Sequence, residues 1–193
     1  MKNLVGQKAP DFVSDALINK KITNGFSLSQ FKGQKVLLFF YPLDFTFVCP
    51  TELHAFQEAA EKFKELGVQV MGCSVDSVFS HQAWVNTPKA KGGIEGVTYH
   101  LISDLNKTIA TDFGVLSDTG VAFRGLFLID QKGIIRHMLV NDLPLGRSVD
   151  EAIRVVEALN FHEQHGEVCP ANWNSSKKAM KPTTEGLKQY FSA

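Results

Sequence analysis

Residues 35–52 read KVLLFFYPLDFTFVCPTE, and they carry the clearest indication of the fold class. After its first residue the run 35–41 is continuously apolar, and it has the length of a strand that a sheet buries on both faces. Pro42 ends the run, and Pro50 suits the first turn of a helix. Cys49 therefore stands where a buried strand passes through a loop into a helix.

Strand and helix patterns alternate along the chain, which is typical of an α/β protein. Short apolar groups before residue 33 predict a small hairpin. Apolar residues at helical spacing after Pro50 predict a helix that Gly67 would end. Asp104 is placed to cap a helix over residues 105–113. Further strands are predicted over residues 68–75, 101–102, 125–130 and 134–140, with a helix through 81–85.

The C-terminal part of the chain is less regular. Ser148 and Glu151 form a capping box that opens a helix. The inward face of this helix would carry Ile153, Val156 and Leu159. Beyond it the pattern weakens, and residues 166–193 are predicted to form an extended tail. We therefore divide the chain into a domain over residues 1–160 and a tail over residues 161–193.

Composition excludes several classes of function. The 193 residues are 44% hydrophobic, and 20 Lys and Arg balance 20 Asp and Glu. A nucleic-acid partner is not expected, because phosphate binding requires a basic surface. No apolar run approaches the roughly 18 residues of a membrane span, and the N-terminus lacks the apolar segment of a secretory signal. We expect a cytoplasmic protein whose three cysteines are kept reduced.

Cys49 occupies a position that activates thiols. The first turn of a helix leaves backbone N–H groups unpaired, and the helix dipole adds partial positive charge there. A free cysteine has a pKa of about 8.5, and helix N-termini or nearby cations lower such values to roughly 3.5–7.5. The position favours a nucleophile, although a buried inert cysteine would fit the same pattern.

The residues around Cys49 narrow its chemistry. Thr46 stands three positions upstream, where Cys-x-x-Cys proteins carry their first cysteine, so exchange between adjacent thiols is not possible. A single activated thiol beside a hydroxyl suits attack on an O–O bond, which yields a sulfenic acid that a second thiol must remove. Pro42 and Pro50 would shape a rigid pocket around the sulfur.

Residues 41–52, YPLDFTFVCPTE, resemble the active-site segment of the peroxiredoxins, Pro-x-x-x-Thr-x-x-Cys. They are most similar to the typical two-cysteine class, which includes the peroxidase component of alkyl hydroperoxide reductase and the thioredoxin peroxidases. The resemblance implies a thioredoxin-like fold, with a central mixed sheet flanked by helices, an N-terminal hairpin and an extended C-terminal tail. It covers nearly the whole chain and continues through HQAW (81–84), RGLFLID (124–130), DLPLGR (142–147) and GEVCP (166–170).

The resemblance also implies roles for single residues. Cys49 would be the peroxidatic cysteine, Thr46 would hydrogen-bond the peroxide, and Pro42 would close the pocket. Arg124 would stabilise the thiolate and polarise the O–O bond, as a fixed cation can where charge develops.

Glu52 and Arg147 would orient Arg124 through ion pairs, again by resemblance. The alternative for Arg124 is a cation at a strand end with no role in chemistry. For Glu52 and Arg147 the alternative is a pair of surface ions.

Cys169 lies in the predicted tail. The family places this cysteine on the partner subunit as the resolving thiol, which implies an intersubunit Cys49–Cys169 disulfide and a homodimer that assembles into a decamer. The implied substrates are hydrogen peroxide and alkyl hydroperoxides. The implied reductant is thioredoxin or a dedicated flavoprotein disulfide reductase, and no metal or other cofactor is expected on this chain.

Three alternatives stay open at this point. A redox-regulated holdase chaperone or a peroxide-signalling assembly would use the same residues. General disulfide exchange is disfavoured by the missing Cys-x-x-Cys. A metal site is the third, because His162, His165 and Cys169 could share one helical face if the helix ran through Gly166. Cys73 falls inside a predicted strand and is interpreted as a small buried hydrophobe.

One departure from the family bears on overoxidation of Cys49. Relatives that are prone to it carry Gly-Gly-Leu-Gly and a C-terminal Tyr-Phe. Here Tyr190 and Phe191 are present, but residues 92–96 read GGIEG, with Glu95 at the place of the third glycine. We therefore expect intermediate sensitivity.

Overall fold

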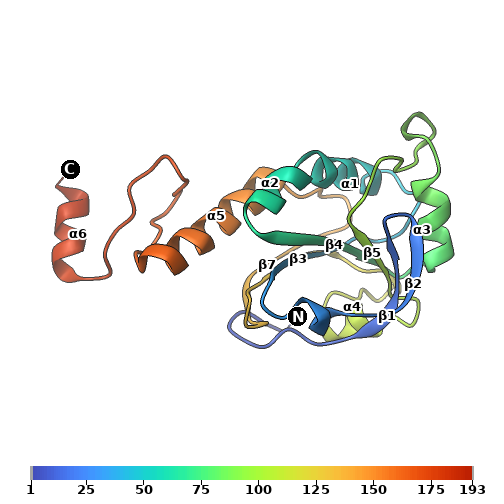
Figure 1. Cartoon of the computed structure of the whole chain (residues 1–193), viewed down its shortest axis with the longest axis horizontal. Helices are drawn as coiled ribbons and strands as arrows, with labels where there is room; N and C mark the ends of the chain where they lie inside the picture. The colour runs from blue at the N-terminus through green and yellow to red at the C-terminus, as the bar shows by residue number, and fades with distance from the viewer. Residues whose placement is uncertain (1, 193) are drawn as a thin grey trace. The chain divides into compact units, whose positions relative to one another are not determined.

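The computed structural model describes residues 2–192, and the chain divides after Arg147 into two compact units. The first unit is built on a seven-stranded sheet in the order β2-β1-β5-β4-β3-β6-β7 (Figure 1). Strand β4 pairs in parallel with β3 and β5, and the other pairs are antiparallel, so the sheet is mixed as expected. The strands are β1 Val13–Ile18, β2 Lys21–Ser27, β3 Lys35–Phe40, β4 Val68–Ser74, β5 His100–Ser103, β6 Arg124–Ile129 and β7 Ile135–Asn141.

The predicted N-terminal hairpin is formed by β1 and β2. Its turn consists of Asn19 and Lys20, which both take left-handed backbone angles, with φ of 49° and 64°. A two-residue turn of this kind matches the twist of the flanking strands, and asparagine is among the residues that tolerate it.

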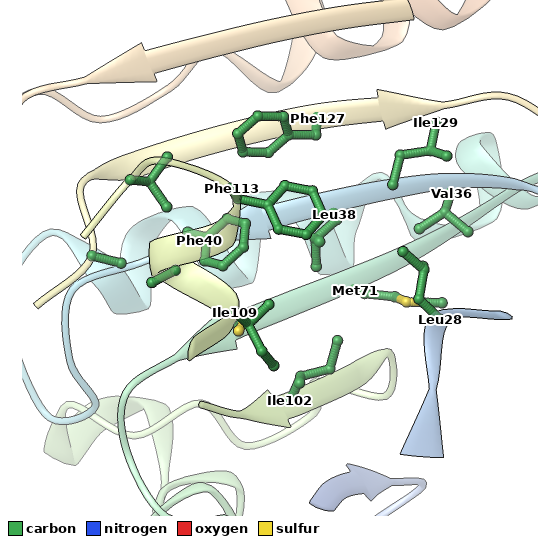
Figure 2. Close-up of a cluster of buried hydrophobic side chains, with 14 of the residues drawn as sticks. Leu28, Val36, Leu38, Phe40, Met71, Ile102, Ile109, Phe113, Phe127 and Ile129 are labelled. Atoms are coloured by element: carbon green, nitrogen blue, oxygen red, sulfur yellow. The ribbon is translucent and has the colours of Figure 1, made fainter. Parts of the chain in front are cut away.

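Strand β3 is buried along its whole length because it lies between β4 and β6. Successive side chains point to opposite faces of the sheet. Leu38 and Phe40 join Phe113 in the core cluster on one face (Figure 2). On the other face Phe39 stacks on Phe56 of helix α1, with ring centroids 4.4 Å apart. The apolar run therefore contributes side chains to the core on both faces of the sheet. It also determines where β3 ends.

Two predicted helices differ in extent from the observed ones. The helix predicted from Pro50 to Gly67 is two helices, α1 Cys49–Glu58 and α2 Ala60–Glu65, separated at Ala59. Helix α4, Thr108–Asp112, begins later than predicted because Lys107 takes a left-handed φ of 61°. Lys107 and not Asp104 is its N-cap residue, but the Asp104 carboxylate still accepts two amides in the first turn of α4, those of Ile109 and Ala110. The remaining helical segments of this unit are α3 Val78–Val85 and the short 3-10 helices Leu28–Phe31 and Lys89–Lys91.

The second unit holds helices α5 Val149–His165 and α6 Thr184–Phe191. The Ser148 hydroxyl accepts the Glu151 amide at 3.2 Å, as the capping box predicts. Along α5 Val156 is buried, whereas Ile153 and Leu159 are partly buried. The sequence pattern missed α6, which the Thr183 side chain caps by accepting an amide at 3.0 Å. Within residues 2–192 no helix is long and apolar enough to cross a membrane.

Candidate active site

Cys49 is the first residue of α1, and its side chain is 0% exposed. Val48 before it supplies no side-chain cap, and Pro50 after it has no amide hydrogen. Strand β3 ends just before the buried Pro42. The loop that follows places the Cys49 sulfur at the N-terminus of α1, the positive end of the helix dipole. The strand-loop-helix junction predicted from the sequence is confirmed.

Arg124 is a buried cation that reaches the sulfur. It starts β6, is 3% exposed, and its Nη1 lies 3.5 Å from Cys49 Sγ. Its Nε donates to the Leu143 carbonyl at 2.7 Å, and Nη1 also donates to Glu52 at 2.6 Å. Arg124 is therefore held on two sides and is not a strand-end cation in solvent.

Glu52 lies between two buried arginines. Arg147 donates to its carboxylate through Nε at 2.8 Å, through Nη2 at 2.9 Å and through the main-chain amide at 2.9 Å. The remaining Nη1 of Arg147 donates to the carbonyls of Phe40 and Gly125. Burial lowers the pKa of Arg147, and the Glu52 carboxylate opposes that effect. Neither residue is a surface ion, since their side chains are 1% and 3% exposed.

The charges of this cluster leave one excess positive charge beside the sulfur. Arg124 and Arg147 contribute two positive charges, and Glu52 contributes one negative charge. All three are buried, so the excess positive charge is poorly hydrated. A thiolate at Cys49 brings the cluster to neutrality. This arrangement can hold a nucleophilic sulfur ready for an electrophile.

Thr46 is half-buried in the loop before Cys49. Its hydroxyl donates to the Leu43 carbonyl at 2.9 Å, which leaves the oxygen lone pairs free to accept a hydrogen bond. The loop also presents two exposed aromatic side chains, Phe45 and Phe47. They give the approach to the site an apolar rim.

A buried polar network under this loop was not predicted. The Tyr41 hydroxyl donates to Asp44 at 2.9 Å, and the other Asp44 oxygen lies 2.8 Å from Nδ1 of His81. The Asp44 amide donates to Asp76 at 2.9 Å. Burial raises the pKa of Tyr41, and burial followed by the nearby Asp44 charge raises the pKa of Asp76. The network anchors the loop that carries Thr46, and its signal in the sequence was weak, because His81 lies between two other polar residues, Ser80 and Gln82, in α3.

The other two cysteines differ in setting. Cys73 is fully buried in β4, where burial raises its thiol pKa well above the usual range, as suits an inert core residue. Cys169 lies in the second unit, is partly exposed, and points at the Ala158 carbonyl with Sγ at 3.5 Å. The helix required for a metal site at His162, His165 and Cys169 is absent, because α5 ends at Gly166, whose φ is 68°.

A layered mixed sheet with a buried cysteine at a helix start, next to a fixed arginine, defines a thioredoxin-like thiol enzyme. The family model described as AhpC/TSA family matches residues 5–138, and the C-terminal domain of 1-Cys peroxiredoxin matches residues 158–193. The chain belongs to the AhpC/TSA family and is a peroxiredoxin of the two-cysteine type.

Relatives and solved structures agree with this assignment. Peroxiredoxin-2 of Mus musculus is 50% identical over 189 residues, covering 97% of this chain and 95% of its own. The reduced 2-Cys peroxiredoxin of Plasmodium vivax is 48% identical, with a TM-score of 0.96 over 100% of both chains. Thioredoxin peroxidase I of Plasmodium yoelii is 48% identical, with a TM-score of 0.79 over 89% of this chain and 99% of that one.

The thioredoxin-like fold is thereby confirmed, and the chain is a thiol-dependent peroxidase. The relatives favour this activity over the chaperone alternative. General disulfide exchange stays disfavoured, because Thr46 stands where that chemistry would need a first cysteine.

Proposed function

We propose that Cys49 is the peroxidatic thiol and that Cys169 resolves its oxidised form. The observation that carries the first assignment is the cluster in which the buried Arg124 Nη1 lies 3.5 Å from the buried Cys49 sulfur. We assign Glu52 and Arg147 the task of holding Arg124 in that place, as their ion pairs support.

In the first step the Cys49 thiolate attacks one oxygen of a hydroperoxide. An S–O bond forms, the O–O bond breaks, and the leaving oxygen departs as water or an alcohol after gaining a proton. Negative charge develops on that oxygen, and the Arg124 guanidinium stabilises it as a preorganised cation. The Thr46 hydroxyl oxygen accepts a hydrogen bond from the peroxide, while Pro42 shields the site from water. Hydrogen peroxide and alkyl hydroperoxides both satisfy this scheme.

In the second step Cys169 of the partner subunit attacks the Cys49 sulfenic acid. The S–O bond breaks, an S–S bond forms, and water leaves. Because the Cys49 side chain is 0% exposed, the first turn of α1 must open before the two sulfurs meet. An outside dithiol protein then reduces the disulfide. We propose thioredoxin for this role, or a dedicated flavoprotein disulfide reductase, and the relative named thioredoxin peroxidase I supports the former.

Assembly as a homodimer, and of dimers into a decamer, belongs to the same proposal. Strand β7 lies at one edge of the sheet, and an edge strand can pair with a second copy of the chain. Large apolar side chains exposed elsewhere on the first unit support a further contact. They include Phe47, Phe79 and Leu105.

We also propose that the chain divides into two parts at residue 160 and that the protein is cytoplasmic. The family match that begins at residue 158 supports a catalytic domain over residues 1–160 and a resolving tail over 161–193. Three free thiols, at Cys49, Cys73 and Cys169, suit the reducing cytoplasm.

The test is a non-reducing gel of the reduced protein after one equivalent of hydrogen peroxide. Wild type should form a disulfide-linked dimer, and Cys49→Ser and Cys169→Ser should not. Cys73→Ser is the matched control and should behave as wild type. A wild-type band that stays monomeric while Cys49 is consumed would contradict the intersubunit disulfide, and an unreactive Cys49 would contradict its peroxidatic role.

A further inference from the structure

The segment that carries Cys169 lies against one face of α5. Cys169 Sγ approaches the Ala158 carbonyl at 3.5 Å, and the Trp173 carbonyl accepts from Arg154 Nη1 at 3.0 Å. The Trp173 ring lies 5.1 Å from the Phe161 ring. The three α5 positions are four and three residues apart, so they are neighbours on one helical face. The position of Cys169 is thus set by contacts with this face.

Arg154 is itself held in one orientation. Its Nε and Nη2 donate to the two carboxylate oxygens of Glu151, at 2.6 and 2.8 Å. This bidentate pair fixes the guanidinium plane and directs Nη1 at the Trp173 carbonyl. Each nitrogen of the guanidinium therefore has a hydrogen-bond partner. These partners, Glu151 and the Trp173 carbonyl, take no part in the proposed reaction of Cys49 with peroxide.

Arg154 also acts on the thiol electrostatically. Burial raises the pKa of Cys169, and Arg154 lowers it in part. Glu151 faces Arg154, and Nδ1 of His162 lies 2.8 Å from the Glu167 carbonyl.

We propose that Arg154 is a positioning residue for the resolving thiol, which holds the Cys169 segment on α5 and stabilises the thiolate that attacks the Cys49 sulfenic acid. The inference rests on the proposed function. Cys169 gives up its proton, the two sulfurs form a bond, and the S–O bond of the sulfenic acid breaks. The departing hydroxide takes a proton and leaves as water, so no further oxidant or reductant takes part.

The same combination serves both thiols. Glu52 holds an arginine beside Cys49, and Glu151 holds an arginine that acts on Cys169. The second pair is less buried, with side chains 34% and 43% exposed, so water screens it more strongly. Arg154 should therefore affect Cys169 as a partly exposed ion pair would. We expect it to change the ionisation equilibrium of the Cys169 thiol about two- to fivefold.

The test uses Arg154→Gln, which removes the charge, and Arg154→Lys, which keeps it but loses the bidentate geometry. Lys64→Gln, which breaks an exposed i,i+3 pair in the first unit, is the matched control. The first readout is titration of the Cys169 thiolate by ultraviolet absorbance in a Cys49→Ser background. Arg154→Gln should titrate at higher pH than wild type, and Arg154→Lys and the control should titrate close to wild type.

The second readout is the rate of disulfide formation after one equivalent of hydrogen peroxide, with Cys49 intact. Arg154→Gln should slow it about two- to fivefold at neutral pH, while consumption of peroxide stays unchanged. A Cys169 titration identical in Arg154→Gln and wild type would overturn the proposal, and so would equal slowing by Arg154→Gln and Lys64→Gln. Failure of wild type to form the Cys49–Cys169 disulfide would instead overturn the proposed function.

Discussion

Replacing Glu52 by glutamine should strongly destabilise the reduced protein. The substitution keeps the shape of the side chain but removes the negative charge between Arg124 and Arg147, which lie 2.6 and 2.8 Å from its oxygens. Removal of one partner of a buried ion pair costs about 3–5 kcal/mol. At about 2–4 °C per kcal/mol for a chain of this size, the midpoint of thermal unfolding should fall by roughly 6–20 °C.

Calorimetry of the reduced protein at fixed concentration measures this change, and stopped-flow mixing with hydrogen peroxide measures its effect on activity. Arg124 keeps its bond to the Leu143 carbonyl but loses its carboxylate anchor, so the rate with peroxide should fall by about tenfold or more. Glu61→Gln is the control, because Glu61 is 84% exposed and pairs with Lys64 at 3.5 Å. Equal unfolding midpoints for the two variants would refute the idea that the cluster is energetically coupled.

Three further outcomes are expected. Gly93→Ala should lower the unfolding midpoint, because a Cβ there would lie 1.9 Å from the Thr87 carbonyl oxygen; calorimetry checks this. His54→Leu removes the contact between His54 Nε2 and the Gly93 carbonyl at 3.1 Å, which ties α1 to that loop. Opening of α1 should become about two- to tenfold easier, so mass spectrometry should find less sulfinic Cys49 at a given peroxide dose. Because burial raises the pKa of Cys169, its thiolate is scarce at neutral pH. Rapid-quench trapping should therefore show disulfide formation accelerating as pH rises toward that pKa.

Local sequence features predicted much of the fold. The run 35–41 identified a strand buried on both faces, and Ser148 was correctly assigned as a helix cap. Asp104 accepts amides in the first turn of α4 but is not its N-cap residue. The break at Ala59 could not be predicted, because alanine favours helix and no residue type marks the interruption. Helix α6 was missed because it is short and few of its residues are apolar, so only the Thr183 cap signalled it.

The sequence named residues that the structure brings together around Cys49, but it gave none of the geometry that joins them. The resemblance named Arg124, Glu52 and Arg147, yet which nitrogen meets which oxygen depends on how β6, α1 and the segment before α5 are brought together. The network of Tyr41, Asp44 and His81 was missed although all three residues lie in segments that carry the resemblance. His81 is 37 positions from Asp44, and only the folded sheet shows that this fully buried histidine has a carboxylate partner.

In the proposed cycle Cys49 must be buried to react and exposed to be resolved. We propose that the charge of its surroundings reconciles these two demands. With a thiolate present, the cluster of Arg124, Arg147 and Glu52 is neutral and the closed site is favourable. Oxidation to a neutral sulfenic acid removes the one charge that balanced the second arginine, and a buried excess charge is costly. In the proposed cycle, the reaction that consumes the peroxide would therefore weaken the closed form of α1. Opening would follow oxidation because the reduced site would be stabilised by the anion that oxidation removes.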